Sequence, residues 1–373
     1  MKKYIMLLVI AIMMSFNAQV FAMAENADCA CVINSATGEV IFSKNISERH
    51  AMASTTKIMT AIIALERCKL DDIVLVSSNA ANQEGSSAYV KENHQLYLRD
   101  ALYGLMLNSG NDIAVAIAEN IAGSEEAFAQ LMNEKALELG LRNTHFVNPN
   151  GLDHPEHFTT AADLAVIARY AMANNDFREI VATQTYQAKP LNDEEILYFS
   201  NHNKMLGLYE GTTGIKTGFT QATGRCLVSS AKRDNMEFIA VTLGDSDDWN
   251  EHMQMLDYAF AEHYPKKVIE KDMTIKVAQI DGKRYNMVAA DDFVVPFKEN
   301  GKVSVELVSH MSDNLKSPIN AGEKVGYMEI RCDDMTIGSV DIISQTDIGN
   351  VTNIRIKNSF YNSFMHIVKR LLV

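Results

Sequence analysis

The chain has 373 residues, of which 47% are hydrophobic and 22% are charged, so it can bury a large core and should divide into about two domains. A formal net charge of -13 and an isoelectric point near 5.3 argue against nucleic acid as a partner, because phosphate binding needs a concentrated basic face.

The N-terminal residues have the pattern of a secretory signal peptide. An unbroken apolar run from Tyr4 to Met14 follows two lysines, and small residues follow at Ala22 and Ala24. The run is far shorter than the roughly 20 apolar residues that a membrane-spanning helix needs. We therefore predict a signal peptide over residues 1–24, cleaved after Ala22 or Ala24, and an exported protein that works outside the cytoplasm.

A strand pair and then a series of helices are expected next. The runs Cys31–Ile33 and Val40–Phe42 flank a turn and predict a β-hairpin. Apolar residues at helical spacing then predict a helix that begins near Ser54, a second helix that ends before Ser109, and a third helix that follows Ser124. This part of the chain is therefore mostly helical.

Two further strands, Cys226–Ala231 and Glu237–Leu243, follow the helices and precede a helix over about 249–263. The order predicts an α/β (α+β) domain over residues 25–263, in which helices pack on an antiparallel sheet whose strands come from both ends of the domain.

The cysteines suggest neither a metal site nor a disulfide framework. Five are present: Cys29, Cys31, Cys68, Cys226 and Cys332. Their number is odd, and their spacing does not match that of a metal-binding motif. Cys29 and Cys31 lie two apart on a predicted strand and so share a face, and we expect these two to fill the core as small side chains.

The last third of the sequence changes in character. Short alternating runs broken by Gly and Asn predict a small β-rich domain over residues 264–357, with runs at Met273–Val277, Val303–Val308 and Val325–Ile330. Residues 358–373 have apolar side chains at helical spacing with cations on the flank. We predict an amphipathic helix that lies in a membrane surface, and packing onto the preceding domain is the alternative.

Three short motifs carry the chemistry, and they occur in the order Ser54–Lys57, Ser109–Asn111 and Lys216–Gly218. Each motif alone is weak, since Ser229–Lys232 matches the first pattern as well. Only one set combines a helix start, a helix end and a strand edge in sequence, and Ser229 lies within a predicted strand. We therefore take these three motifs as one candidate site.

The first motif fits a nucleophile and its base. Ser54 in the first turn of a helix has its oxygen near the positive end of the helix dipole, and Lys57, one turn later, projects from the same face. Lys57 can accept the serine proton only if it is neutral, so burial and a second cation must lower its pKa. Lys216 can supply that cation.

The remaining motif residues have roles in proton transfer and substrate binding. Ser109 can extend the proton path toward a leaving amine, and the Asn111 amide can hold a substrate carbonyl. Lys216 and Thr217, on a strand edge, can bind a terminal carboxylate.

These motifs resemble those of the low-molecular-weight penicillin-binding proteins that are D-alanyl-D-alanine carboxypeptidases of the S11 peptidase family. The likeness extends to Ala53–Thr60, Asn148–Leu152 and Thr159–Leu164 and covers essentially the whole mature chain. It implies a serine β-lactamase/DD-peptidase-like domain, an all-β second domain and a terminal amphipathic helix that attaches the protein to the outer face of the cytoplasmic membrane.

The resemblance also implies a reaction. Ser54 would attack the bond between the two D-alanines of a peptidoglycan pentapeptide, release the last one, and water would clear the acyl-enzyme. β-Lactam antibiotics imitate that substrate. The oxyanion would lie between the backbone N–H groups of Ser54 and Phe219, so Gly218 and Phe219 join Lys216 and Thr217 as substrate-binding residues. No cofactor or metal is implied.

Two related functions remain as alternatives. A serine β-lactamase of class A shares these motifs but needs a glutamate that drives water onto the acyl-enzyme. Glu194 and Glu195 are better explained as part of a solvated turn. The second alternative is a catalytically silent cell-wall-binding protein, which the intact Ser54, Lys57 and Lys216 argue against.

A metallopeptidase is a third alternative, because the segment His154–His157 brings two histidines and a glutamate together. Pro155 breaks the helix that a spaced histidine pair would need, so we expect a plain surface loop without metal. His202 and Asn203 precede the third motif and are left outside the predicted site.

Overall fold

The structure is a computed structural model that describes residues 23–280, 282–298, 305–312, 315–332 and 335–350. Within these residues no helix is both long enough and apolar enough to cross a membrane. Apart from Met23 and Ala24, the predicted signal peptide lies outside the described residues, and so does the predicted terminal helix over 358–373.

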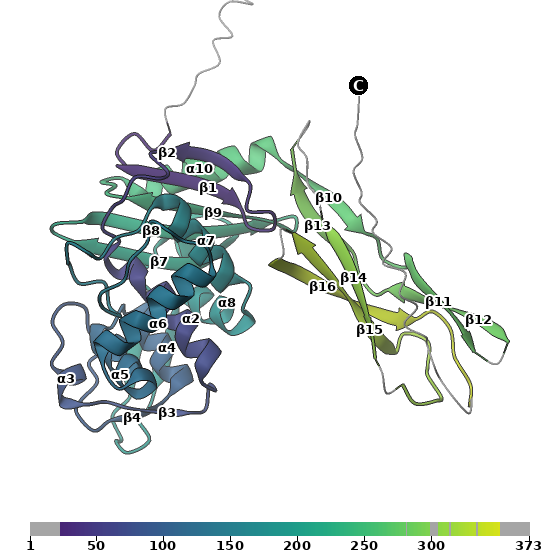
Figure 1. The fold of residues 1–373 in the computed structure, drawn as a ribbon, viewed down its shortest axis with the longest axis horizontal. Coiled ribbons are helices and arrows are strands. Elements are labelled where there is room, and N and C mark those ends of the chain that lie inside the picture. The colour runs from purple at the N-terminus through teal and green to yellow at the C-terminus, as the bar shows by residue number, and fades with distance from the viewer. Residues whose placement is uncertain (1–22, 281, 299–304, 313–314, 333–334, 351–373) are drawn as a thin grey trace, which may run out of the picture.

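A five-stranded antiparallel sheet organises the first domain, with the strand order β2-β1-β9-β8-β7 (Figure 1). The predicted hairpin and the two later strands are confirmed, and the first strand lies against the last, with Cys29 opposite Leu243. The strands are β1 (Cys29–Asn34), β2 (Val40–Lys44), β7 (Thr212–Thr220), β8 (Gly224–Arg233) and β9 (Met236–Leu243).

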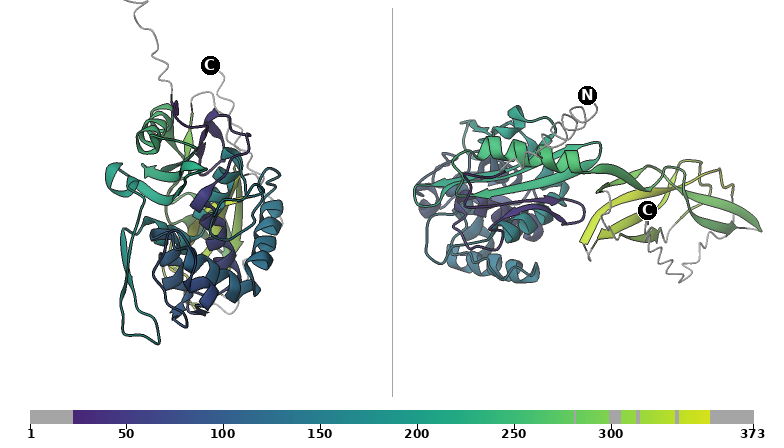
Figure 2. Two further views of the ribbon diagram at one scale, coloured as in Figure 1. Left: turned by 90° about the vertical axis from the view of Figure 1, so that its left-hand side faces the viewer. Right: turned by 90° about the horizontal axis from the view of Figure 1, so that it is seen from above.

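Helices cover both faces of this sheet, with α10 and the short α9 on one face and the remaining helices on the opposite face (Figures 1 and 2). The main helices are α2 (Lys57–Arg67), α4 (Leu98–Leu107), α5 (Asn111–Ala122), α6 (Glu125–Glu138), α7 (Ala161–Met172), α8 (Asn175–Ala182) and α10 (Asp248–Glu262). Shorter elements are η1 (Ala53–Thr56), α3 (Ser78–Ala81), α9 (Met205–Leu208), β3 (Ile73–Leu75), β4 (Gln95–Tyr97), β5 (Thr185–Ala188) and β6 (Leu197–Ser200). The predicted α/β class is confirmed.

Period-two alternation along the strands divides the core between the two faces. Cys29 and Cys31 point into the larger core with α2 and α7, whereas Ala30 and Val32 point into the core beneath α10. All five cysteines are buried except Cys68, which is half-buried. The expected role of Cys29 and Cys31 as core filler is therefore confirmed.

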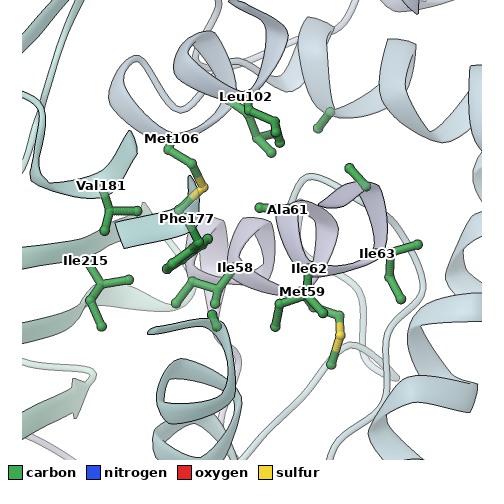
Figure 3. Packing of buried hydrophobic residues seen from close by; sticks show 14 of the residues in the cluster. Ile58, Met59, Ala61, Ile62, Ile63, Leu102, Met106, Phe177, Val181 and Ile215 are labelled. Atoms are coloured by element: carbon green, nitrogen blue, oxygen red, sulfur yellow. The ribbon is translucent and has the colours of Figure 1, made fainter. Parts of the chain in front are cut away.

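Helix α2 runs through the centre of the larger core. Ile58 and Ile62, one turn apart, are buried and pack with Met106, Phe177 and residues from other elements (Figure 3). This apolar packing fixes the helix that begins at Lys57, the last residue of the first motif.

The second domain is all-β, as predicted. Its five-stranded sheet has the order β11-β12-β16-β15-β14, and a two-stranded sheet joins β10 to β13. The strands are β10 (Tyr264–Ile269), β11 (Thr274–Ile280), β12 (Lys283–Ala289), β13 (Phe293–Phe297), β14 (Glu306–Met311), β15 (Lys324–Cys332) and β16 (Met335–Ser344). It extends from one side of the first domain, and the Asn34 side chain donates to Pro296 O across the junction, 3.3 Å away (Figure 2).

Candidate active site

Ser54 lies in the short 3-10 turn η1, directly before α2. Ala53 begins this turn with φ of 45°, in the left-handed region, and Thr55 Oγ1 donates to Met52 O at 2.6 Å. Strand β7 runs close to the turn, because a Cβ on Gly218 would lie 3.1 Å from both Met52 O and Ser54 N. Glycine at this position therefore lets the third motif approach the nucleophile.

Lys57 is completely buried, and its side-chain nitrogen has three oxygen neighbours. Lys57 Nζ lies 3.1 Å from Ser54 Oγ, 2.7 Å from Asn111 Oδ1 and 2.6 Å from Asn150 O. The predicted approach of Lys57 to Ser54 is thus present in the structure. The first two motifs meet at one nitrogen atom.

The electrostatics around Lys57 favour a neutral amine. Burial holds the pKa of Lys57 well below its usual value, the charge of Lys216 lowers it further, and Asp112 opposes this. Burial also lowers the pKa of Lys216 to about 7. Two lysines in one water-poor region are the condition that the sequence argument required.

The second motif is held by a loop that precedes it. Asn111 Nδ2 donates to Glu84 O at 2.6 Å, and Asn111 N donates to Ser86 O at 2.7 Å. Ser109 has φ of 59°, and its buried Oγ has no hydrogen-bond partner among the residues that the structure describes. A buried hydroxyl without a partner can turn its proton toward an incoming group.

The third motif lies on β7. Lys216 is 1% exposed and its Nζ donates to Thr217 O at 2.9 Å, whereas Phe219 is largely exposed. Just beyond the motif, the hydroxyls of Thr220 and Thr223 donate to Asp153 Oδ1 at 2.8 and 3.0 Å. These bonds connect the end of β7 with the loop that carries Asn150.

The loop Asn148–Leu152 contributes more than sequence reasoning assigned to it. Its Asn150 carbonyl accepts from Lys57, and its Pro149 carbonyl accepts from Thr60 Oγ1 at 2.6 Å. Gly151 has φ of 91°, and a Cβ there would lie 2.0 Å from Ala53 O. In the sequence, the role of this loop was indicated only by its likeness to the family motif. A backbone carbonyl can accept a hydrogen bond from any residue type, so the residue type does not reveal it.

The expectation of a plain surface loop at His154–His157 is wrong for its last residue. His157 is 3% exposed, and its Nε2 lies 2.7 Å from Thr56 Oγ1 within the first motif. His154 and Glu156 are exposed as expected. Within the described residues, no group of three or more His, Cys, Asp or Glu is placed to hold a metal ion.

Two other residues outside the predicted set lie near the site. Burial and the charge of Lys216 lower the pKa of His202, so this ring interacts electrostatically with a residue of the third motif. Asn203 is buried, and its Oδ1 accepts from Met205 N at 3.1 Å. Glu194 and Glu195 pair with Lys189 and Lys91 near the surface, as a solvated turn should.

Comparison with known proteins agrees with this geometry. The sequence profile described as D-alanyl-D-alanine carboxypeptidase matches residues 14–247, and that described as penicillin-binding protein 5, C-terminal domain, matches residues 264–350. D-alanyl-D-alanine carboxypeptidase DacF of Bacillus subtilis is 32% identical over 93% of this chain and 95% of its own length.

Solved structures show the same likeness. The D-alanyl-D-alanine carboxypeptidase DacD from Francisella tularensis is similar with a TM-score of 0.61 and 26% identity, over 89% of this chain and 97% of that chain. The DD-transpeptidase of Streptomyces K15 has a TM-score of 0.61 and 31% identity, over 63% of this chain and 97% of that one.

Proposed function

Because the chain belongs to the D-alanyl-D-alanine carboxypeptidase family of serine-type hydrolases, we propose that Ser54 forms an acyl-enzyme with the penultimate D-alanine of a peptidoglycan pentapeptide. The observation that carries the proposal is the position of Lys57 Nζ between Ser54 Oγ, Asn111 Oδ1 and Asn150 O. No cofactor takes part in the proposed reaction.

A count of hydrogens explains why this arrangement suits a general base. Asn111 Oδ1 and Asn150 O only accept hydrogen bonds, so they take the two hydrogens of a neutral Lys57 amine. The lone pair then faces the remaining neighbour, which is Ser54 Oγ. A neutral lysine is in this way prepared to receive the serine proton.

The proposed reaction proceeds in two steps. Ser54 Oγ bonds to the carbonyl carbon while its proton passes to Lys57, and the negative charge on the carbonyl oxygen lies between the N–H groups of Ser54 and Phe219. The C–N bond then breaks, and the departing D-alanine amine takes the proton by way of Ser109. Water next attacks the ester and regenerates Ser54.

Substrate binding is proposed for the edge of β7 and for Asn111. Lys216 and Thr217 would bind the terminal carboxylate, because a protonated lysine and a hydroxyl donate charge-assisted hydrogen bonds to it. Gly218 leaves the space beside Ser54 N that the substrate carbonyl needs. Penicillin, which presents a carboxylate and a reactive amide in one small molecule, would acylate the same serine and inhibit the enzyme.

We also propose that the protein works outside the cytoplasm, on the outer face of the membrane. The signal-like residues 1–24 and the amphipathic residues 358–373 support this through their sequence. The corresponding domain division is 25–263 for catalysis and 264–357 for the β-rich part. A fractionation of cells that express the full chain, with and without residues 358–373, tests the attachment.

Labelled penicillin tests the acyl-enzyme. We expect a stable covalent label on the wild type and none on Ser54→Ala, while Ser229→Ala, which alters the other Ser-x-x-Lys segment, keeps the label. Digestion of a pentapeptide muropeptide should release one D-alanine with the wild type only. No label on the wild type would favour the silent wall-binding protein, and a label that is lost within seconds would favour the β-lactamase.

A further inference from the structure

The buried imidazole of His157 connects to the nucleophile turn through the side chain of Thr56. Val147 N donates to His157 Nδ1 at 3.0 Å, His157 Nε2 lies 2.7 Å from Thr56 Oγ1, and Thr56 Oγ1 donates to Ala53 O at 2.7 Å. The ring also packs edge-on against Phe146, with 5.8 Å between ring centroids. His157 is thus fixed on both sides, and the mechanism proposed above gives it no role.

The direction of this hydrogen-bond chain follows from counting protons. A neutral imidazole has one N–H, and Nδ1 already accepts from Val147, so the hydrogen is on Nε2. Thr56 has one hydroxyl hydrogen, which goes to the Ala53 carbonyl, so its oxygen accepts from His157. Both ends give the same order: Val147 N–H to His157, His157 to Thr56, and Thr56 to Ala53 O.

The last acceptor of the chain belongs to the peptide group of the nucleophile. Ala53 C=O and Ser54 N–H form one planar trans unit, in which the two bonds point in opposite directions. The backbone N–H of Lys57 bonds to Ser54 O and Thr55 O instead of to Ala53 O. The Thr56 hydroxyl therefore acts together with the backbone bonds of the 3-10 turn to hold the direction of the Ala53 carbonyl, and with it the direction of Ser54 N–H.

We infer that His157 is a positioning residue for the oxyanion site: through Thr56 it orients and polarises the Ala53–Ser54 peptide group, so that Ser54 N–H faces the charge that develops on the substrate. The inference rests on the proposed acyl-enzyme reaction. A hydrogen bond to a carbonyl strengthens the N–H of the same peptide group as a donor, because consecutive hydrogen bonds polarise one another. The left-handed φ of 45° at Ala53 marks a backbone that needs such support.

The surroundings keep the ring neutral, which the chain requires. Burial lowers the pKa of His157 to about 4, the charges of His145, His154 and Lys57 act in the same direction, and Asp153 acts against them. A protonated ring would lose its Nδ1 acceptor and break the contact to Val147. His157 therefore holds one tautomer throughout the neutral range.

Paired substitutions separate positioning from simple packing. Gln at position 157 is long enough to place an amide N–H near the Nε2 position, whereas Asn reaches only the Nδ1 position. Likewise Thr56→Ser keeps the hydroxyl and Thr56→Val removes it. We expect His157→Asn and Thr56→Val to slow acylation by penicillin about tenfold, less than the hundredfold or more that loss of an oxyanion donor costs. His157→Gln, Thr56→Ser and the exposed control His154→Asn should stay within about threefold of the wild type.

A spectroscopic readout tests the oxyanion site directly. In the penicilloyl-enzyme, hydrogen bonds from this site lower the stretching frequency of the ester carbonyl, which an infrared difference spectrum records. We expect a shift to higher frequency in His157→Asn and Thr56→Val, and no shift in Thr56→Ser. The double variant should be no slower than either single variant, because both residues act through one chain.

Three outcomes would overturn the inference: an unshifted ester band in variants that acylate slowly, additive losses in the double variant, or unchanged acylation in both His157→Asn and Thr56→Val. Failure of the underlying reaction looks different, because the wild type would then form no ester on Ser54. Thermal unfolding of each variant shows whether it is folded, and the Thr56 pair carries the test if His157→Asn does not fold.

Discussion

The two domains differ in how many polar side chains they bury. Within the described part of the β-rich domain, Ser344 is the one buried polar side chain. The catalytic domain instead buries many polar and ionisable side chains, among them Lys57, Asp112, Lys135, His157, Lys216, Glu237, Asp245, Glu251 and His252. Burial of an ionisable group costs free energy unless partners compensate it. That cost is concentrated in the domain that carries the proposed chemistry.

The comparison implies that the two domains have different tasks. A core without ionisable groups can be stable over a wide range of conditions, whereas a core with a neutral lysine depends on pH and on the exact contacts around it. The stability of the first domain should therefore depend more on pH than that of the β-rich domain.

Loss of the neutral amine should have the largest effect. Lys57→Met keeps the volume of the side chain but removes the base, so acylation by penicillin should fall about 10³- to 10⁴-fold, the upper end of what a general base contributes. Lys276→Met in the β-rich domain is the matched control and should acylate normally. Stopped-flow measurement of acylation checks both, and rapid acylation by Lys57→Met would contradict the proposed base.

Acid should separate the stabilities of the two domains. Burial lowers the pKa of His252 to about 3 from an ordinary value of 6.5, so the unfolded state binds a proton that the folded state does not. The stabilising effect is complete above pH 6.5 and is lost as the pH falls toward 3. At pH 4.5 this single group should lower the free energy of unfolding by roughly 3 kcal/mol.

Denaturation with urea at pH 7 and pH 4.5 measures this effect. We expect His252→Gln to show a smaller loss between the two pH values than the wild type. His157 acts in the same direction and Asp245, whose pKa is raised to about 7 mainly by burial, acts in the opposite one. His157 and Asp245 contribute equally in the variant and the wild type, so the difference between the two proteins reports His252 alone. If both proteins lose the same free energy of unfolding between pH 7 and pH 4.5, His252 is not the source of the acid sensitivity.

Glycine substitutions can compare the two domains at similar backbone angles. Gly151 has φ of 91° and its Cβ position lies 2.0 Å from Ala53 O, whereas Gly322 in the β-rich domain has φ of 83° and open space around it. Gly322→Ala should cost about 1 kcal/mol of stability, from backbone strain alone. Gly151→Ala should cost about 2 kcal/mol more, because the backbone must also move. If thermal unfolding shows equal losses of stability in the two variants, the loop around Gly151 can move without additional cost.

The smallest effect concerns Lys216 and the alkaline side of the pH profile. Burial lowers the pKa of Lys216 to about 7, so binding of a carboxylate substrate should weaken above that pH. A bound carboxylate raises this pKa, so the alkaline limb of kcat should lie about one pH unit above that of kcat/KM. A substrate with an amidated C-terminus has no carboxylate for Lys216 to bind, so the alkaline limbs of its kcat and kcat/KM profiles should lie at the same pH. Coincident limbs with the pentapeptide would contradict the proposed role of Lys216.

Much of the site was readable from sequence because its side chains occur in local motifs. Ser54 and Lys57 lie one turn apart, so helical spacing alone predicts their contact, and alternation along β1 predicts that Cys29 and Cys31 share a face. The contributions of Asn150 and His157 were not predicted. Both reach the site from a distant loop, one through a backbone carbonyl and the other through Thr56, and such contacts depend on how the chain folds back on itself.

The pairing of β1 with β9 also has a consequence for biosynthesis. The polypeptide emerges from the ribosome with Cys29–Asn34 early and Met236–Leu243 late, and yet these segments are neighbours in the sheet. Until the second segment has been synthesised, the first has a free edge, and β9 is not yet there to join β1 to β8 and β7. Premature termination before residue 236 should therefore yield an inactive, incompletely folded chain that proteases degrade.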